Sequence, residues 1–158
     1  MWKAEIAEKL IRVFVRGRLS PSIRTLSVED FRRAALAMRD ETIVVTCRDV
    51  ARVLRSFLAS RIHLADLVDW TTVIFYGVHP NVIMQVDWSA PRGVHLSHKG
   101  MNDPRGIAQI GVEYEEKCSD VIAEIMNDLE DLEVEGPEPS RENVSAWLQK
   151  LSECGDAE

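Results

Sequence analysis

Hydrophobic side chains recur at the spacing of one helical face along most of the chain. In the clearest stretch, from Cys47 to about Ser60, apolar residues stand at i, i+3, i+4, i+7 and i+8: Val50, Val53, Leu54, Phe57 and Leu58. Because an α-helix has about 3.6 residues per turn, this spacing gives one apolar face that can turn toward a core. Similar spacing predicts further helices over residues 2–16, 27–39, 64–76, about 115 or 119 to 132, and 140–152.

Capping residues mark where several of these helices begin. Ser27 and Ser140 can each accept a hydrogen bond from the free backbone N–H groups of a first helical turn. Thr46 and Asp49 have the three-residue spacing of a capping box. The chain is expected to start new helices at these points.

Two segments lack the helical pattern. Residues 42–45, Thr-Ile-Val-Val, have the composition of a short strand. Residues 77–114 contain eight glycines and prolines, which interrupt any helical period. Within this longer segment, residues 81–88 and 107–114 suit two strands joined by a polar loop.

We therefore predict a mainly α fold: a helical bundle of about six helices with a small two-stranded β element within residues 81–114. The 158 residues suit a single domain. Along it we expect an N-terminal helical extension over residues 1–42, a helix pair over 43–76, an irregular or β segment over 77–114, and acidic C-terminal helices over 115–153.

The net charge of −7 is distributed unevenly. Residues 1–61 contain 13 Lys and Arg against 7 Asp and Glu, which gives +6, whereas residues 62–158 contain 6 against 19, which gives −13. Such polarity arises either because the two portions pair with each other or because one of them meets an oppositely charged partner.

The acid excess is densest between residues 113 and 138, where eleven carboxylates are opposed by Lys117 alone. On a helix, carboxylates four residues apart, as in the series from Glu116 to Asp128, share one face and repel by about a few tenths of a kcal/mol per pair. The carboxylates that we expect to contact a partner are Glu113, Glu116, Asp120, Glu124, Asp128, Asp131, Glu133 and Glu135.

Two interpretations of this surface stay open. In the first it is an ordinary solubilising face, compensated by Arg48, Arg52 and Arg55 of the helix over 47–60. In the second it recognises a basic protein, whose approach is steered by the complementary potential.

Other features limit the classes of function. No apolar run approaches the roughly 20 residues of a membrane-spanning helix, and the N-terminus lacks the apolar core of a signal peptide, so we expect a cytoplasmic protein with no membrane partner. Cys47, Cys118 and Cys154 are odd in number and far apart, which favours buried free thiols.

One loop suggests chemistry without completing a motif. His95 and His98, near Asp103, form a His-x-x-His pair with no evident third and fourth ligand, and Ser97 lacks the glycines of a nucleophile elbow. We therefore expect no metal, no cofactor and no catalytic residue, with an enzyme that uses this loop as a remaining alternative.

The main alternative is a regulatory or nucleic-acid-associated binding module that uses the arginines of the helices over 27–39 and 47–60. The acid excess argues against nucleic acid as the main partner.

The helix over 64–76 carries Asp66 and Asp69 in its first turns, where the helix dipole favours carboxylates. Trp70 of the same helix is expected in the core.

Two stretches of the sequence resemble the self-protective colicin-like immunity proteins. The first contains Asp49-Val50, Leu54, Phe57-Leu58, Leu67 and Asp69-Trp70. The second contains residues 120–125, residues 131–137, Val144, Trp147-Leu148 and Leu151. Together they cover about half of the chain; roughly the first 40 residues are additional, and the segment 77–114 is longer than the family pattern.

The resemblance implies a small helical protein that binds and blocks a co-produced toxin, often a nuclease with a basic active site. An acidic face then takes the place of the substrate phosphates. The expected partner is accordingly a basic protein toxin.

Overall fold

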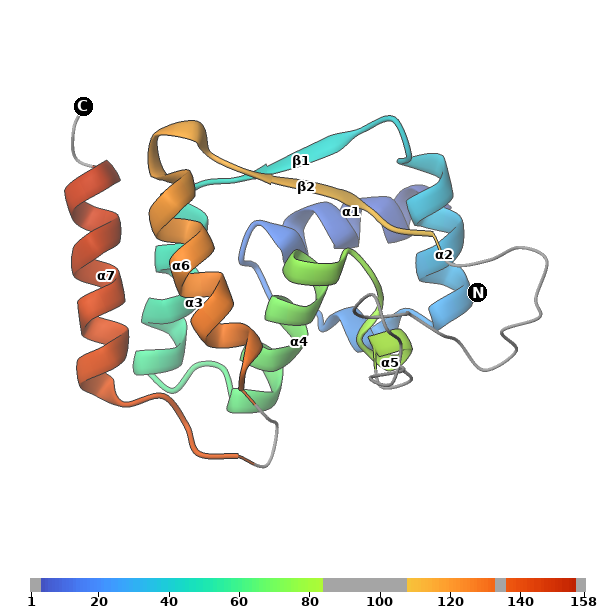
Figure 1. Cartoon of the computed structure of the whole chain (residues 1–158). Helices are drawn as coiled ribbons and strands as arrows, with labels where there is room; N and C mark the ends of the chain where they lie inside the picture. The colour runs from blue at the N-terminus through green and yellow to red at the C-terminus, as the bar shows by residue number, and fades with distance from the viewer. Residues whose placement is uncertain (1–3, 84–107, 133–135, 156–158) are drawn as a thin grey trace, which may run out of the picture.

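The computed structural model of the chain describes residues 4–83, 108–132 and 136–155 (Figure 1). These ranges contain seven α-helices and a two-stranded sheet, so the fold is mainly α with a small β element, as predicted. In chain order the elements are α1 (Ala4–Val15), the 3-10 helix η1 (Ile23–Thr25), α2 (Val28–Ala37), β1 (Thr42–Val45), α3 (Cys47–Leu58), α4 (Leu64–Tyr76), α5 (Pro80–Ile83), β2 (Gly111–Tyr114), the 3-10 helix η2 (Glu116–Cys118), α6 (Ser119–Glu130) and α7 (Arg141–Gly155).

The predicted helix starts are confirmed by side-chain caps. The Ser27 hydroxyl accepts a hydrogen bond from the Asp30 amide at 3.0 Å. At the start of α3, the Asp49 amide donates to Thr46 Oγ1 at 3.2 Å while the Thr46 amide donates to the Asp49 carboxylate at 2.9 Å. Both caps satisfy backbone donors that the first turn of a helix leaves free.

The sheet pairs different segments from those that the sequence suggested. Strand β1 lies parallel to β2, with Thr42 opposite Gly111 and Val45 opposite Tyr114. Residues 81–83 belong to helix α5 instead of a strand, and residues 84–88 lie outside the described ranges. The expected β element within 81–114 is therefore wrong in its pairing. A hydrophobic pattern identifies a strand but not its distant partner, and parallel strands always need a long connection.

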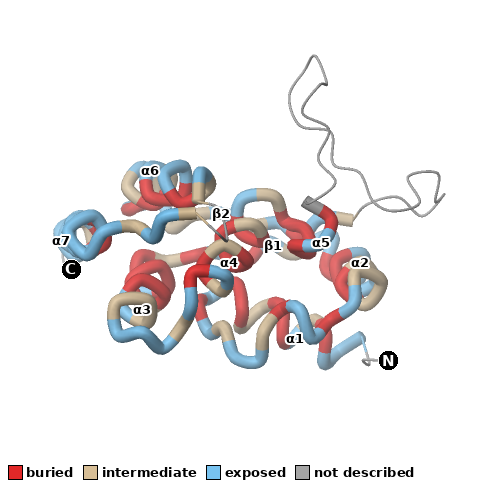
Figure 2. Tube along the Cα trace, turned by 90° about the horizontal axis from the view of Figure 1, so that it is seen from below, coloured by how far each residue is buried: buried red, intermediate tan, exposed pale blue. Residues whose placement is uncertain are grey.

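Helix α4 lies in the middle of the molecule. It contacts α1, α3, α5 and α6, and its Trp70 side chain is fully buried. Figure 2 shows α3 and α6 on opposite sides, with α7 beside them at one end of the molecule. Among the described residues, no helix combines the length and the apolar character that crossing a membrane requires.

The N-terminal helices share the core with the rest of the chain. Helix α1 packs on α2, α4 and β1, and the Trp70 indole N–H donates to the Val15 carbonyl at 3.1 Å. One continuous cluster of buried side chains runs from Ala7 to Leu151. The Asp-Trp pair of α4 is thus directly tied to the first 40 residues.

The expectation of three free thiols is wrong for two of the cysteines. Cys118, at the end of η2, and Cys154, in the last turn of α7, form a disulfide, while Cys47 is a buried free thiol. The two half-cystines are 36 residues apart in sequence, but the packing of α7 against η2 and α6 brings their Cα atoms to 5.7 Å. Spacing along the chain gives no signal of such a contact.

Candidate functional site

The two faces of α6 carry opposite kinds of side chain. Ile122, Ile125, Met126 and Leu129 are buried against the core, as expected from their spacing. Asp120, Glu124 and Asp128, which are four residues apart, are exposed on the other side. The helix therefore holds three carboxylates in a row while its apolar stripe fixes their direction.

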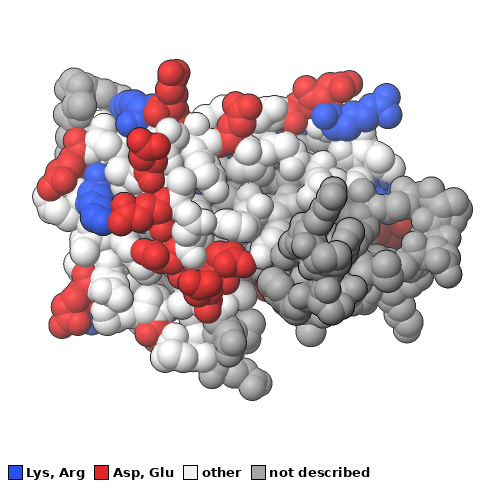
Figure 3. All heavy atoms as spheres, in the orientation of Figure 1, with Lys and Arg blue, Asp and Glu red and all other residues white. Residues whose placement is uncertain are grey.

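The predicted contact residues that the structure describes are all exposed. Besides the three carboxylates of α6, Glu113 lies on β2, Glu116 begins η2, and Asp131 follows the last turn of α6. Glu133 and Glu135 lie outside the described residues. We refer to the six described carboxylates as the acidic face: Glu113, Glu116, Asp120, Glu124, Asp128 and Asp131. Figure 3 shows carboxylates gathered over α6 and the neighbouring part of α7.

Helix α7 supplies a cation to the acidic face. Lys150 Nζ lies 2.7 Å from Glu124 Oε1, and this hydrogen bond raises the pKa of Lys150. Both side chains are about half exposed, so the pair is open to solvent and salt. Within the described parts of the chain, the other five carboxylates of the acidic face make no ion pair.

The arginines of α3 lie on another side of the molecule. The Arg52 guanidinium donates to the Arg16 carbonyl at 2.6 Å and to Asp49 Oδ1 at 3.4 Å, both away from α6. Arg48 and Arg55 line a hollow between α3 and α7. Figure 2 shows α3 across the molecule from α6. Compensation of the acidic face by the arginines of α3, one of the two interpretations of the sequence, thus finds no support in the arrangement of the helices.

Two aromatic rings lie close to the end of α6. The Tyr76 hydroxyl donates to Glu130 Oε1 at 2.6 Å, and burial followed by the neighbouring Glu130 raises the pKa of Tyr76. The adjacent Phe75 ring stands 5.0 Å from the Tyr76 ring and is 40% exposed. An exposed apolar ring thus lies beside the C-terminal end of the carboxylate row. The sequence does not predict the exposure of Phe75, because that exposure depends on how α4 packs.

A second polar cluster holds α4 to the N-terminal segment. Arg24 Nε and Nη2 donate to the two oxygens of the buried Asp69 carboxylate at 2.7 and 2.9 Å, and Arg24 Nη1 donates to Asn81 Oδ1 at 2.8 Å. The hydrogen bond to Asp69 raises the pKa of Arg24. Asp66 has the role expected from the sequence, because its carboxylate accepts from the His63 amide at the start of α4. Asp69 has a different one, since it holds an arginine 45 residues away.

Buried His79 completes this polar cluster. Its Nδ1 accepts a hydrogen bond from the Asn81 amide at 3.1 Å, which leaves Nε2 to carry the proton and donate to the Leu26 carbonyl at 2.8 Å. Burial lowers the pKa of His79. Every polar atom of the ring is used within the fold, so we assign the cluster of Arg24, Asp69, His79 and Asn81 to structure.

The other residues singled out for chemistry are not brought into a described site. His95, Ser97, His98 and Asp103 lie outside the described residues. Comparison with protein-family models, with curated proteins and with solved structures finds no significant match to this chain.

Proposed function

We propose that the chain is a cytoplasmic immunity protein that binds a basic protein toxin through the acidic face and neutralises it. The observation that carries the proposal is the row of exposed carboxylates on α6, of which Glu124 alone makes an ion pair within the described parts of the chain. The resemblance of the sequence to self-protective colicin-like immunity proteins supports the same conclusion. The action is stoichiometric occlusion and requires no catalytic residue.

The row of carboxylates on α6 has opposite electrostatic effects on folding and on binding. Like charges at a spacing of four residues destabilise a helix by about a few tenths of a kcal/mol per pair, so the row works slightly against folding. Toward a basic partner the same row is favourable, because complementary potentials accelerate the encounter and exclude wrong partners. If the toxin is a nuclease, the carboxylates occupy the place of its substrate phosphates.

Charge alone gives weak binding once salt screens it, so a stable complex also needs an apolar anchor. Phe75 fits this role, because it is exposed and its neighbour Tyr76 is hydrogen-bonded to the last residue of α6. Interface energy concentrates in buried aromatic residues surrounded by polar contacts. We therefore propose Phe75 as an apolar anchor at the C-terminal end of the carboxylate row, next to the acidic face.

The proposal is tested by a pull-down from the native host at low and high salt. Wild type is compared with the Glu116/Asp120/Glu124/Asp128→Lys variant, and each captured protein is expressed alone and together with this chain. We expect a basic protein that the wild type recovers at low salt, that the variant loses, and whose toxicity the wild type relieves. If the variant recovers the basic protein as well as the wild type does, the interface lies outside the acidic face.

A second candidate function rests on a basic hollow of about 670 Å³ next to Gly17. Its polar lining consists of three arginines, three serines and one carboxylate, Arg18, Arg52, Arg61, Ser20, Ser22, Ser56 and Asp66. The excess of arginines suits an anionic ligand such as a phosphate of nucleic acid. Binding of a DNA or RNA oligonucleotide that is lost in an Arg18/Arg61→Glu variant would favour this function.

A further inference from the structure

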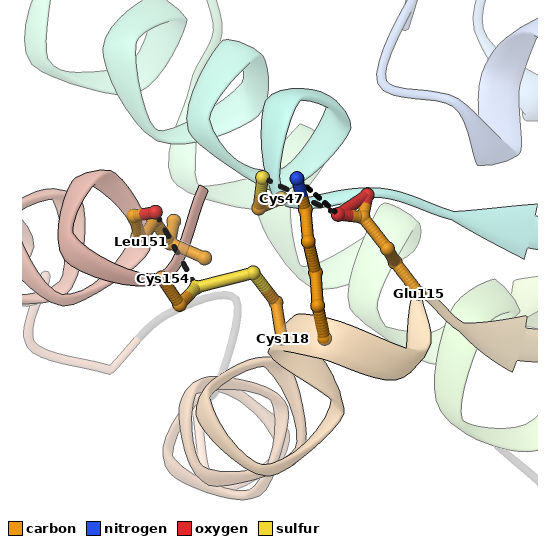
Figure 4. The surroundings of a disulfide bond; sticks show 6 residues. Cys47, Glu115, Cys118, Leu151 and Cys154 are labelled. Atoms are coloured by element: carbon orange, nitrogen blue, oxygen red, sulfur yellow. Dashed lines mark hydrogen bonds and ion pairs between the residues drawn. A yellow bond between two sulfur atoms is a disulfide. The ribbon is translucent and has the colours of Figure 1, made fainter. Parts of the chain in front are cut away.

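All three cysteines and one carboxylate meet at a point where four segments of the chain come together (Figure 4). Cys47 is the first residue of α3, Glu115 follows β2, Cys118 ends η2, and Cys154 lies in the last turn of α7. Figure 4 shows Cys47 Sγ turned toward the Glu115 carboxylate, with the Cys118–Cys154 disulfide nearby. Neither the charge pattern nor the proposed acidic face accounts for this convergence.

The sheet explains how the first two residues meet. Val45 at the end of β1 pairs with Tyr114 at the end of β2, and the Glu115 amide then donates to the Val45 carbonyl at 2.8 Å. The residue after β2 is therefore held beside the start of α3. From the other side the end of α7 approaches closely, since a Cβ atom on Gly155 would stand 2.7 Å from Cys47 Sγ. A larger residue at this position would force the Cys47 side chain to shift.

The donor atoms have the separations of a metal site. One ligand atom each of Cys47, Glu115 and Cys118 lies within 4.8 Å of the other two, and Cys47 Sγ is 3.8 Å from Glu115 Oε1. Cys154 Sγ is bonded to Cys118 Sγ. In a tetrahedral site with Zn–S bonds of about 2.3 Å, sulfur ligands stand about 3.8 Å apart. Cys47, Glu115 and Cys118 thus form the observed donor set, and reduction of the disulfide frees Cys154 Sγ, which lies next to Cys118 Sγ, as the fourth donor.

The surroundings favour a cation at this point. Cys47 and Cys118 are 7% and 1% exposed, and Glu115 Oε1 lies 3.8 Å from Cys47 Sγ. A divalent cation bound here would be shielded from water, and it would stabilise the thiolate form of the cysteines that it binds. Lys117 Nζ, 3.7 Å from Glu115 Oε1, helps to balance the negative charge of a site with three thiolates and a carboxylate.

We propose that the reduced chain binds one Zn²⁺ ion through the thiolates of Cys47, Cys118 and Cys154 and the carboxylate of Glu115. Sulfur-rich tetrahedral sites select zinc over hard cations, and a site with four protein ligands is structural. The ion joins α3, η2 and α7, the same elements that the disulfide and the contact at Gly155 bring together. A hollow of about 130 Å³ at the surface is lined by Cys47 and Gly155 and so reaches one of the four proposed ligands.

The disulfide and the zinc site are alternative states of the same residues. A cellular dithiol reduces the Cys118–Cys154 bond with two electrons and two protons and is itself oxidised to a disulfide. Zinc then replaces the protons of the three thiols, which are released to solvent. A compartment that keeps thiols reduced favours the metal-bound state, and an oxidising one favours the disulfide.

Cobalt binding tests the proposal, because Co²⁺ replaces zinc and reports its ligands by absorption. The reduced full-length chain is titrated with Co²⁺ and then with Zn²⁺ without oxygen, beside Cys47→Ser, Glu115→Gln and the matched control Glu116→Gln. Cys47→Ser and Glu115→Gln retain the cysteine pair of the disulfide, so both can be purified folded in the oxidised form before reduction.

We expect the wild type to bind one Co²⁺ with thiolate-to-cobalt charge-transfer bands and the visible bands of a tetrahedral ion, and Zn²⁺ to displace it. Cys47→Ser and Glu115→Gln should each weaken binding by at least about 10-fold to 100-fold, and Cys47→Ser should also lower the charge-transfer intensity, while Glu116→Gln binds as the wild type does. Binding without thiolate bands, or equal affinity in all four proteins, would overturn the proposal.

Discussion

Around Asp69, oppositely charged groups face each other, because the buried carboxylate accepts two hydrogen bonds from Arg24. Both ring nitrogens of the adjacent His79 form hydrogen bonds with backbone groups. Along α6 the charges are alike, exposed and set in a row, and Lys150 pairs with Glu124 alone. Both regions are polar and both involve α4, because Asp69 lies on this helix and α6 packs against it. They differ in whether the fold itself satisfies the charge.

The difference separates two uses of charged residues. Where a charge is buried, leaving it without a partner costs several kcal/mol, so the fold must provide one. Where a charge is exposed, water solvates it at little cost and it stays available to a second molecule. We therefore expect changes near Asp69 to alter folding and changes on α6 to alter binding.

The largest expected effect on folding comes from the disulfide that ties α7 to the acidic side of the molecule. Because it joins residues 36 apart in sequence, reduction should lower the free energy of unfolding by about 4 kcal/mol. Urea unfolding with and without a thiol reductant, both with a metal chelator present, measures the effect. An unchanged midpoint would mean that packing alone holds α7 in place.

Replacing the buried carboxylate of Asp69 should lower the free energy of unfolding by less than reduction of the disulfide does. Asp69→Ala leaves Arg24 without its bidentate partner, and since that arginine is 45% exposed, water takes up part of the loss. We expect a decrease of about 2 kcal/mol in the free energy of unfolding. The matched change Asp128→Ala removes an exposed carboxylate and should shift it by less than about 0.5 kcal/mol. Equal effects of the two changes would contradict the distinction between the regions.

Acid should weaken the cluster around Asp69 through His79. Burial lowers the pKa of His79, so below about pH 6.5, the ordinary pKa of the unfolded chain, the unfolded state binds a proton that the folded state does not. The free energy of unfolding therefore falls as the pH decreases from 6.5 toward the lower pKa of the folded state. Urea unfolding of wild type and His79→Gln at about pH 7.5 and 5.5 should show a smaller decrease in the variant.

Reversing two charges on α6 should have the smallest effect on folding. In Asp120/Asp128→Lys, the two lysines attract Glu124, whereas the two aspartates of the wild type repel it. The free energy of unfolding should therefore stay within about 0.5 kcal/mol of wild type or rise slightly. Thermal unfolding by circular dichroism measures this. A marked loss of stability would mean that these carboxylates serve the fold after all.

The features that sequence alone predicted are local ones. The caps at Ser27 and Thr46 and the buried stripe of α6 depend on residues within one or two turns, so their spacing is visible in the sequence. The exposure of Asp120 and Asp128 is also predictable, because their spacing places them on the face of α6 opposite the buried stripe.

The missed features join residues that are distant in the chain. The pairing of β1 with β2, the disulfide of Cys118 with Cys154, and the ion pair of Arg24 with Asp69 each depend on the packing of whole elements. Periodicity carries no information about which elements meet. The convergence of Cys47 with Glu115 follows from the strand pairing, so it was equally hidden.

The most direct test of whether the acidic face binds a basic toxin uses the basic protein captured in the pull-down. This protein is purified, and its affinity is measured for three forms of the chain. These are the wild type, Asp120/Asp128→Lys on α6, and the matched reversal Glu5/Asp40→Lys, which changes the net charge equally at exposed positions outside the acidic face. Calorimetry at low and physiological salt should show binding at least about tenfold weaker for the α6 variant, near wild type for the control, and weaker for the wild type as salt rises. Equal weakening in both variants would show that only net charge matters, and unchanged affinity in the α6 variant would contradict the account.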